Sequence, residues 1–222
     1  MSRLDELLEI LEESSDKEMM LLSQPELEVA SKSNSVLVRC KVCDAVIYYP
    51  TDFAQNLLIT LLTDRNAEVR ASAACYLEYY SDEAVKSALQ QAFFQDNDPY
   101  VRGYGGYSLL KIAATDDQIV SAVENALLKE RNLFVRTCCY GALYLFCRKK
   151  RALKQITYCF KSKNYRTRCA TGHTLMEILS EENASEILKA IDAQLKVEDA
   201  FAVQDTLEKL RNKALAITAV KA

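Results

Sequence analysis

The sequence predicts an all-α fold, a right-handed α-α superhelix (solenoid) of about five stacked helix pairs with capping helices at both ends. Three observations indicate this fold: a recurring arginine, an N-cap residue four positions before it, and one apolar stripe along each predicted helix. The arginines recur at intervals of 31, 32, 34 and 32 residues, at Arg39, Arg70, Arg102, Arg136 and Arg168. Self-similarity at such a period is typical of a stacked helical-repeat array.

A helix is expected to begin at the same point of every repeat. The residue four positions before each arginine has a side-chain oxygen that can accept a hydrogen bond from the first helical turn. These residues are Ser35, Asn66, Asp98, Asn132 and Asn164. Pro99 follows Asp98 at the first helical position, where its missing N–H is no loss.

One face of each of these helices is apolar. A valine precedes four of the five arginines, and the positions seven and ten residues after the arginine are also apolar. This spacing predicts an amphipathic helix with one buried face. The positions three and four residues after the arginine are mostly small, so Gly105 and Gly106 are expected where two helices approach closely. Gly103 has no such explanation.

We expect a single repeat domain over residues 1–222, because an amphipathic segment precedes each capped helix and completes a pair. The predicted repeats span 16–50, 53–81, 83–114, 116–148 and 149–180. An N-terminal cap helix is expected at 3–13 and C-terminal cap helices at 182–220, since such arrays need end units with a polar outer face.

Composition narrows the function classes. The net charge is −3, from 28 basic and 31 acidic residues, so no overall attraction to nucleic acid or anionic lipid is expected. The N-terminal segment is acidic, without the basic and apolar regions of a signal peptide, and no run of 18 apolar residues occurs. Eight cysteines without an export signal indicate reduced thiols, so the predicted location is cytoplasmic.

One repeat carries a family pattern. Residues 64–77 follow D-x-x-x-x-V-R-x-x-A-A-x-x-L, with Asp64, Val69, Arg70, Ala73, Ala74 and Leu77. This pattern resembles the HEAT-repeat superfamily in its short bacterial form of roughly 30 residues per repeat. The resemblance covers about residues 16–198.

The resemblance implies a polar ladder between adjacent repeats. Asp64 with Arg70 and Asp96 with Arg102 are its expected members, and Arg136 stands at the matching position of the next repeat. The first and fifth repeats depart from the pattern, with Ser33 and Ser162 at the acidic position. In this family the second helix of each pair lines the concave side of the superhelix. The resemblance therefore implies a binding surface on the second helices.

Tyrosines gather on that predicted surface. Positions two, five and nine after each arginine point away from the apolar stripe, and tyrosine offers a large apolar body with one polar tip. The candidate partner-binding residues are Tyr48, Tyr79, Tyr104, Tyr107, Lys111, Tyr144, His173 and Glu177. The alternative is that several tyrosines, notably Tyr49, Tyr80 and Tyr140, are packing residues.

No metal site or cofactor is predicted. Cys40 and Cys43 have the spacing of half a zinc site, but no second such pair exists and the chain has one histidine. His173 is interpreted as a surface histidine. Residues 148–168 are locally basic and could bind nucleic acid or an acidic protein, although a solvated loop and helix start is the favoured interpretation.

The function favoured by these patterns is a non-enzymatic scaffold or adaptor that binds a partner protein on a tyrosine-rich concave face. An immunity protein that covers the active site of a toxin is one form of it. A phycobilin lyase-like protein remains open because its repeat length is similar. A DNA glycosylase of the helical-repeat type is less favoured, since the chain has no tryptophan and a negative charge. One histidine excludes a deoxyhypusine hydroxylase, whose two irons need paired His-Glu motifs.

Overall fold

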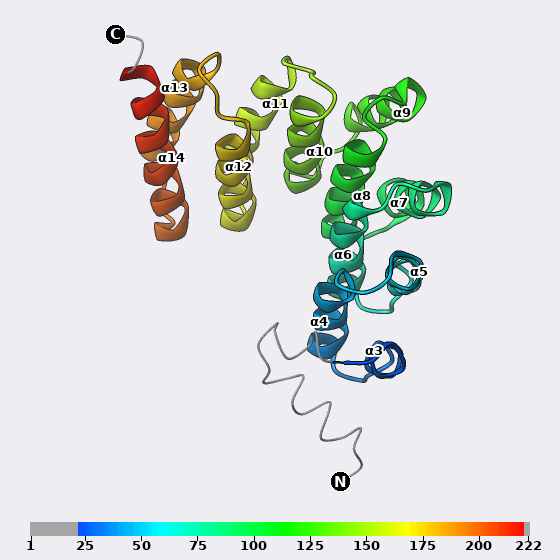
Figure 1. Cartoon of the computed structure of the whole chain (residues 1–222). Helices are drawn as coiled ribbons and strands as arrows, with labels where there is room; N and C mark the ends of the chain where they lie inside the picture. Colours follow the sequence, from blue (N-terminus) through cyan, green and yellow to red (C-terminus); the bar gives the residue numbers. More distant parts are fainter. Residues whose placement is uncertain (1–21, 220–222) are drawn as a thin grey trace. The chain divides into compact units, whose positions relative to one another are not determined.

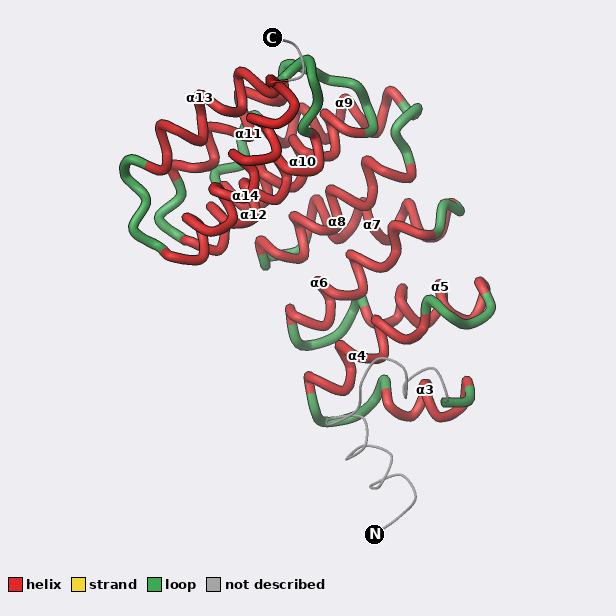
Figure 2. The backbone as a smooth tube through the Cα atoms, turned by 60° about the vertical axis from the view of Figure 1, so that its left-hand side comes forward, coloured by secondary structure: helices red, strands yellow, loops and turns green. Residues whose placement is uncertain are grey.

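The computed structural model describes residues 22–219, and every regular element in this range is a helix. Twelve α-helices and two short 3-10 helices alternate with brief loops (Figures 1 and 2). The all-α prediction is therefore confirmed, and consecutive helices form the stacked pairs expected of an α-solenoid. The chain divides into two compact units, residues 1–113 and 114–222.

The first unit consists of three helix pairs in its described part. The first helices of the pairs are α3 (Gln24–Ala30), α5 (Thr51–Leu61) and α7 (Glu83–Gln95). The second helices are α4 (Val36–Val46), α6 (Ala67–Tyr76), which continues into η1 (Leu77–Tyr79), and α8 (Pro99–Ile112). In this unit each second helix packs on its own first helix, and α6 packs between α4 and α8, so α4, α6 and α8 form one layer (Figure 1).

The second unit repeats this arrangement. Its first helices are α9 (Asp117–Leu127), α11 (Ala152–Tyr158), which continues into η2 (Cys159–Lys161), and α13 (Ala184–Leu195). Its second helices α10 (Leu133–Leu145), α12 (Tyr165–Ile178) and α14 (Phe201–Ala219) lie side by side in chain order (Figure 1). The predicted C-terminal caps at 182–220 thus correspond to one more helix pair.

Two predictions about organisation remain predictions. The first is that residues 1–222 form a single domain with the repeat boundaries given above. The packing of helices inside each unit does not test it. The predicted N-terminal cap helix at 3–13 lies outside the described residues.

Capping side chains begin the second helices as the sequence predicts. The side-chain oxygens of Ser35, Asn66, Asp98, Asn132 and Asn164 each accept a hydrogen bond from a backbone N–H of the first turn. These bonds satisfy donors that have no partner within the helix. The repeat therefore sets where each second helix starts.

Glycines allow close contacts between helices at two positions. Gly105 was expected at such a contact, and Gly141 was not. A Cβ atom on Gly105 would lie 3.1 Å from the Cβ of Ala92, which confirms a close approach between α8 and α7. A Cβ on Gly141 would lie 2.6 Å from Cγ2 of Thr174 in α12. Gly141 was expected on the exposed face, five positions after Arg136, but it is buried because adjacent second helices cover that position.

Arginines and carboxylates join consecutive repeats in a register that differs from the expected one. Arg39 donates from Nε and Nη2 to both carboxylate oxygens of Asp64, at 2.7 and 3.0 Å. Arg70 binds Asp96 in the same way, at 2.8 and 2.9 Å. Each carboxylate thus binds the arginine of the preceding repeat, whereas Arg70 and Arg102 reach the main-chain oxygens of Asp64 and Asp96. We call each bidentate pair a rung.

A third rung lies in the second unit, outside the expected set. Arg168 donates to both carboxylate oxygens of Glu198, at 2.8 and 2.7 Å, and the Glu198 side chain is fully buried. Glu198 lies in the loop before α14, where it replaces the aspartate of the other rungs. The fifth repeat therefore has a rung although Ser162 occupies its own acidic position.

The rungs perturb the ionisation of their carboxylates. Burial by itself raises the pKa of Asp64, but the hydrogen bonds from Arg39 and the Asn66 amide, with the charge of Arg39, outweigh it. The net pKa of Asp64 is lowered, and the pKa of Asp96 is lowered by the corresponding contacts. Both carboxylates are therefore ionised in the folded protein at neutral pH.

The rungs should make stability depend on pH. A carboxylate whose pKa is lower in the folded than in the unfolded state stabilises fully above the unfolded pKa of about 4, and this contribution is lost as pH falls through the folded pKa. Asp64→Asn should lower the free energy of unfolding by about 2 kcal/mol at pH 7, and by much less near pH 3. Denaturant unfolding at several pH values measures this, with the exposed Glu28→Gln as the control. A difference that does not change with pH would contradict a stabilising rung.

The contact at Gly141 gives a second test. Alanine in place of glycine improves helix propensity by about 1 kcal/mol, whereas overpacking costs about 1–3 kcal/mol. Gly141→Ala should therefore lower the melting temperature of the wild type. In a Thr174→Ser background, which removes the clashing methyl group, the same change should raise it. Equal effects in both backgrounds would show that Thr174 does not limit the approach of α10 and α12.

Candidate functional site

Two tyrosines at the same repeat position lie exposed on the first unit. Tyr48 and Tyr79 each stand nine positions after an arginine, and each is 60% exposed. Tyr48 follows the end of α4, and Tyr79 ends η1 at the matching end of α6. Because α4 and α6 pack side by side, the two phenols belong to one surface. We call Tyr48, Tyr79 and Lys111 the tyrosine surface.

Lys111 of α8 completes this surface and holds one of its rings. Its Nζ lies 5.2 Å from the centre of the Tyr79 ring and 3.0 Å from Oε1 of Glu78. A cation over an aromatic face and an ion pair both restrict the Tyr79–Lys111 pair. Glu78 was not among the candidate residues, although it stands beside Tyr79 in the sequence.

The two candidate tyrosines of α8 are less accessible to solvent than Tyr48 and Tyr79. Tyr104 and Tyr107 of α8 are half-buried, and Tyr104 packs against the apolar cluster of Ala71, Ala92 and Val101. Their positions, two and five after Arg102, are partly covered because neighbouring second helices lie close together. The exposed part of the predicted surface is therefore concentrated nine positions after the arginine.

Another tyrosine joins two repeats and was missed by the sequence analysis. Burial raises the pKa of the Tyr76 phenol, and a hydrogen bond with the Asp44 side chain of α4 raises it further. The contact links α4 to α6. A signal was present in the sequence, because Asp44 and Tyr76 stand five and six positions after consecutive arginines.

The candidates in the second unit have different surroundings. Tyr144 is half-buried, packs against the hydrophobic core and accepts a hydrogen bond from Nδ2 of Asn183 at 2.9 Å. This contact fixes the loop before α13 and gives Tyr144 a structural role. His173 and Glu177 are exposed one turn apart on α12.

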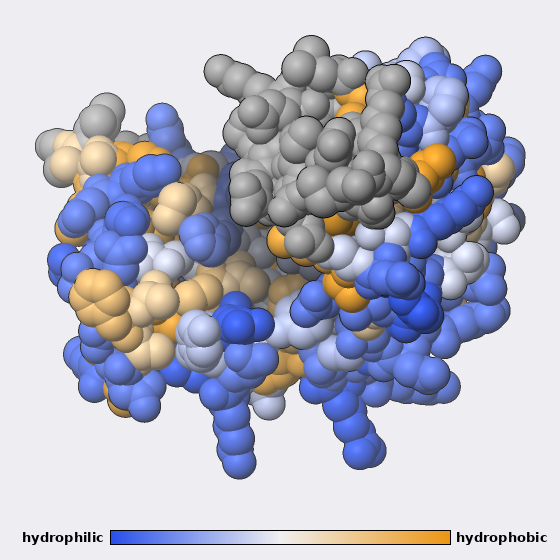
Figure 3. Space-filling view, turned by 90° about the horizontal axis from the view of Figure 1, so that it is seen from below, coloured by the Kyte–Doolittle hydropathy of each residue, from blue (hydrophilic) through white to orange (hydrophobic). Residues whose placement is uncertain are grey.

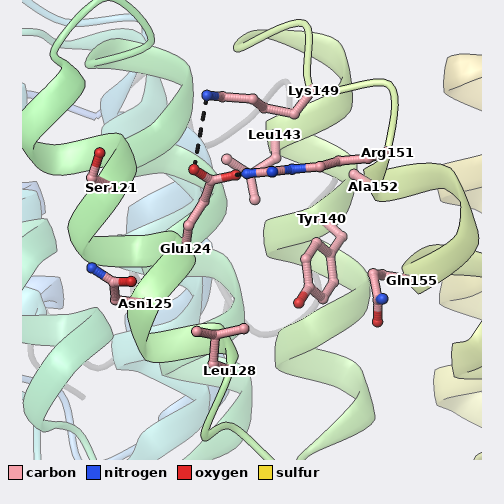
Figure 4. Close-up of a pocket in the computed structure, with 10 residues that line it drawn as sticks. All are labelled: Ser121, Glu124, Asn125, Leu128, Tyr140, Leu143, Lys149, Arg151, Ala152 and Gln155. Carbon is pink, nitrogen blue, oxygen red and sulfur yellow. Dashed lines mark hydrogen bonds and ion pairs between the residues drawn. The ribbon is translucent and has the colours of Figure 1, made fainter.

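A pocket of about 580 Å³ with polar and apolar lining residues lies between α9, α10 and α11 (Figure 4). Glu124 of α9 binds Arg151 at 2.7 Å and Lys149 at 3.8 Å at one end of it. Tyr140 of α10 and Gln155 of α11 line the opposite wall (Figure 4). Tyr140 was considered a packing residue, and its ring is indeed half-buried.

Carboxylates neutralise part of the locally basic segment 148–168, through Lys149, Lys150, Arg151 and Arg168. Besides the two contacts of Glu124, Lys150 binds Glu182, and Arg168 forms its rung with Glu198 and a 3.3 Å contact with Asp199. These pairs favour the interpretation of a solvated loop over a nucleic-acid site, because a phosphate backbone would have to compete with them.

The cysteines pack as small apolar residues. All eight are free thiols, and the Sγ of the buried Cys43 donates to the main-chain oxygen of Arg39. Burial raises the pKa of Cys43 well above its usual value, which disfavours the thiolate that a metal site requires. Among residues 22–219, no group of three or more His, Cys, Asp or Glu side chains is placed to hold a metal ion.

Hydrophilic residues make up most of the face shown in Figure 3, with smaller hydrophobic areas between them. None of the helices in the described part of the chain has the length and apolarity needed to span a bilayer.

Comparison with known proteins agrees with the repeat assignment. Residues 24–110 match the family model described as HEAT repeats. This part of the chain is similar to HEAT repeats. It contains the helix pairs from α3 to α8 and both rungs of the first unit, which confirms the resemblance carried by Asp64, Val69 and Arg70.

Two further comparisons add little to this assignment. No curated protein sequence matches the chain. A solved structure described as an engineered protein aligns over 98% of both chains with 14% identity, and its TM-score of 0.39 is too low to support an argument.

The Lys111–Tyr79 contact can be measured directly. A double-mutant cycle with Lys111→Met and Tyr79→Leu should give a coupling energy of about 0.5–1 kcal/mol in the free energy of unfolding. The same cycle with Tyr48→Leu is the matched control, because Tyr48 occupies the equivalent position in the preceding repeat. Equal coupling for both tyrosines would contradict a specific contact with Tyr79.

Proposed function

We propose that this chain is a non-enzymatic scaffold that binds a partner protein through the tyrosine surface of its first unit. HEAT repeats generally serve as scaffolds for protein interaction, and their stacked helices offer extended surfaces for it. The observation that carries the proposal is the equal 60% exposure of Tyr48 and Tyr79 at one repeated position.

The chemistry of this surface suits protein recognition. An exposed tyrosine offers apolar area and a hydrogen-bonding tip while it loses little side-chain entropy on binding. The contact with Lys111 already restricts Tyr79, which further lowers that cost. Lys111 and Glu78 carry opposite charges beside the ring, and such rim charges set the orientation of a partner.

The exposed aromatic residues favour a protein as the partner over a pigment or DNA. An adaptor client and a toxin whose active site is covered are both proteins that could use exposed aromatic anchors. A tetrapyrrole-binding lyase has no specific feature in its favour among the described residues. DNA binding is disfavoured by the net charge of −3 and by the ion pairs of Lys150, Arg151 and Arg168 in the basic segment 148–168.

Capture of partners by matched variants tests the proposal. Tyr48→Ser with Tyr79→Ser should reduce recovery of a specific partner from the native host at least ten-fold, because aromatic anchors dominate interface energies. Phe94→Ser is the control, since Phe94 is an exposed aromatic residue (45%) on the first helix α7. Quantitative mass spectrometry compares the captured proteins, and circular dichroism checks that helix content is unchanged.

The experiment compares the tyrosine surface with the exposed face of α7 at Phe94. Partners lost equally from the Phe94 variant, or retained by the double tyrosine variant, would contradict the tyrosine surface. A mobility shift with duplex DNA, or visible absorbance from a bound pigment, would point to one of the alternatives instead.

A further inference from the structure

The arginine of the fourth repeat lacks the carboxylate that completes the other rungs. In the first unit, the carboxylates come from Asp64 and Asp96, each two positions before the N-cap residue of the next second helix. The equivalent position for Arg136 is Ser162, two positions before Asn164. The Ser162 hydroxyl accepts a hydrogen bond from the Asn164 amide, so it keeps the loop-ordering role of the aspartate without its charge.

Arg136 is held in place by uncharged groups. Its Nη2 donates to Oε1 of Gln155 at 2.6 Å, and its guanidinium carbon lies 5.6 and 5.5 Å from the ring centres of Tyr140 and Tyr158. Its Nε is buried and has no hydrogen-bond acceptor among the described residues. In the complete rungs, Nε is one of the two donors to the carboxylate.

A hollow of about 600 Å³ in the second unit is lined in part by Arg136. The residues that line it come from the loop between α9 and α10, from α10 and from α11 with η2. They are Leu128, Lys129, Glu130, Arg131, Leu133, Arg136, Tyr158 and Lys161. Four of them are cations and one is a carboxylate, Glu130, whose Oε1 accepts a hydrogen bond from the Asn132 amide.

The rim of the hollow combines charge with apolar area. Leu128 is 80% exposed and Tyr158 is 47% exposed, and Nζ of Lys161 lies 4.6 Å from the centre of the Tyr158 ring. Such a rim suits a peptide whose acidic residue is flanked by apolar ones. A nucleic-acid backbone would present regularly spaced phosphates without the apolar groups that Leu128 and Tyr158 can contact.

We propose that Arg136 forms an open rung that binds an aspartate or glutamate side chain of an acidic segment in a partner protein. The carboxylate takes the place that Asp64, Asp96 and Glu198 fill for Arg39, Arg70 and Arg168. Lys129, Arg131 and Lys161 line the same hollow. The inference rests on the proposed scaffold function only in that its ligand is a protein segment, and it concerns a different surface.

Peptide selection supplies a probe when the partner is unidentified. The immobilised full chain is used to select from a random library of displayed 12-residue peptides, and fluorescence polarisation then measures the affinity of a selected, labelled peptide. We expect enrichment of Asp or Glu beside apolar residues. Replacing that acidic residue with its amide should weaken binding at least ten-fold, because hydrogen bonds between charged groups are strong.

Three variants of the protein locate the contact. Arg136→Gln should weaken binding of the selected peptide at least ten-fold. Ser162→Asp should weaken it as well and raise the melting temperature, because the chain then supplies the missing carboxylate itself. Arg65→Gln removes one exposed positive charge in the first unit and should change affinity less than two-fold.

The results also separate this inference from the tyrosine surface. Selected peptides without acidic residues, or equal affinity for the wild type, Arg136→Gln and Ser162→Asp, would overturn the open rung. Stronger binding of a phosphorylated peptide or of duplex DNA than of the acidic peptide would overturn it too. The Tyr48→Ser and Tyr79→Ser changes should leave peptide affinity unchanged, so failure of one proposal is distinguishable from failure of the other.

Discussion

Direct contact between consecutive second helices constrains most of this structure. α10 approaches α12 at Gly141 and Thr174, and α12 approaches α14 at Gly172 and Thr206, where an added Cβ would lie within 3 Å of a threonine methyl group. Thr206 can be buried there because its Oγ1 donates to the Ala202 oxygen of its own helix at 2.8 Å, and the buried Thr171 of α12 bonds in the same way to the Thr167 oxygen. Small or self-satisfied side chains are therefore a condition of the stacking.

The rungs follow from that contact. When second helices lie side by side, the first turn of one helix lies beside the loop that precedes the next. Arg39 and Arg70 stand in that first turn, and Asp64 and Asp96 stand in that loop, so each arginine reaches the carboxylate of the next repeat. The same aspartates accept hydrogen bonds from the Asn66 and Asp98 amides. One carboxylate thus orders a loop and links two repeats.

The same geometry decides which parts of the second helices remain available for binding. In the first unit, Tyr104 and Tyr107 at positions two and five after Arg102 are half-buried, whereas position nine leaves Tyr48 and Tyr79 exposed. A serine in place of the loop carboxylate leaves Arg136 with an amide and two aromatic rings as partners. Departures from the repeat are therefore the places where the array can accept an external group.

The sequence by itself determined the helix starts, the repeat and the small-residue positions, because capping and periodicity are local properties of the chain. Asn66 and Asp98 mark their helices without reference to any distant residue. Only the tertiary structure decided that Asp64 binds Arg39 rather than Arg70, that Gly141 is buried, and that Glu198 replaces an aspartate. These features depend on how neighbouring repeats are rotated and offset against each other, and spacing along one chain does not contain that information.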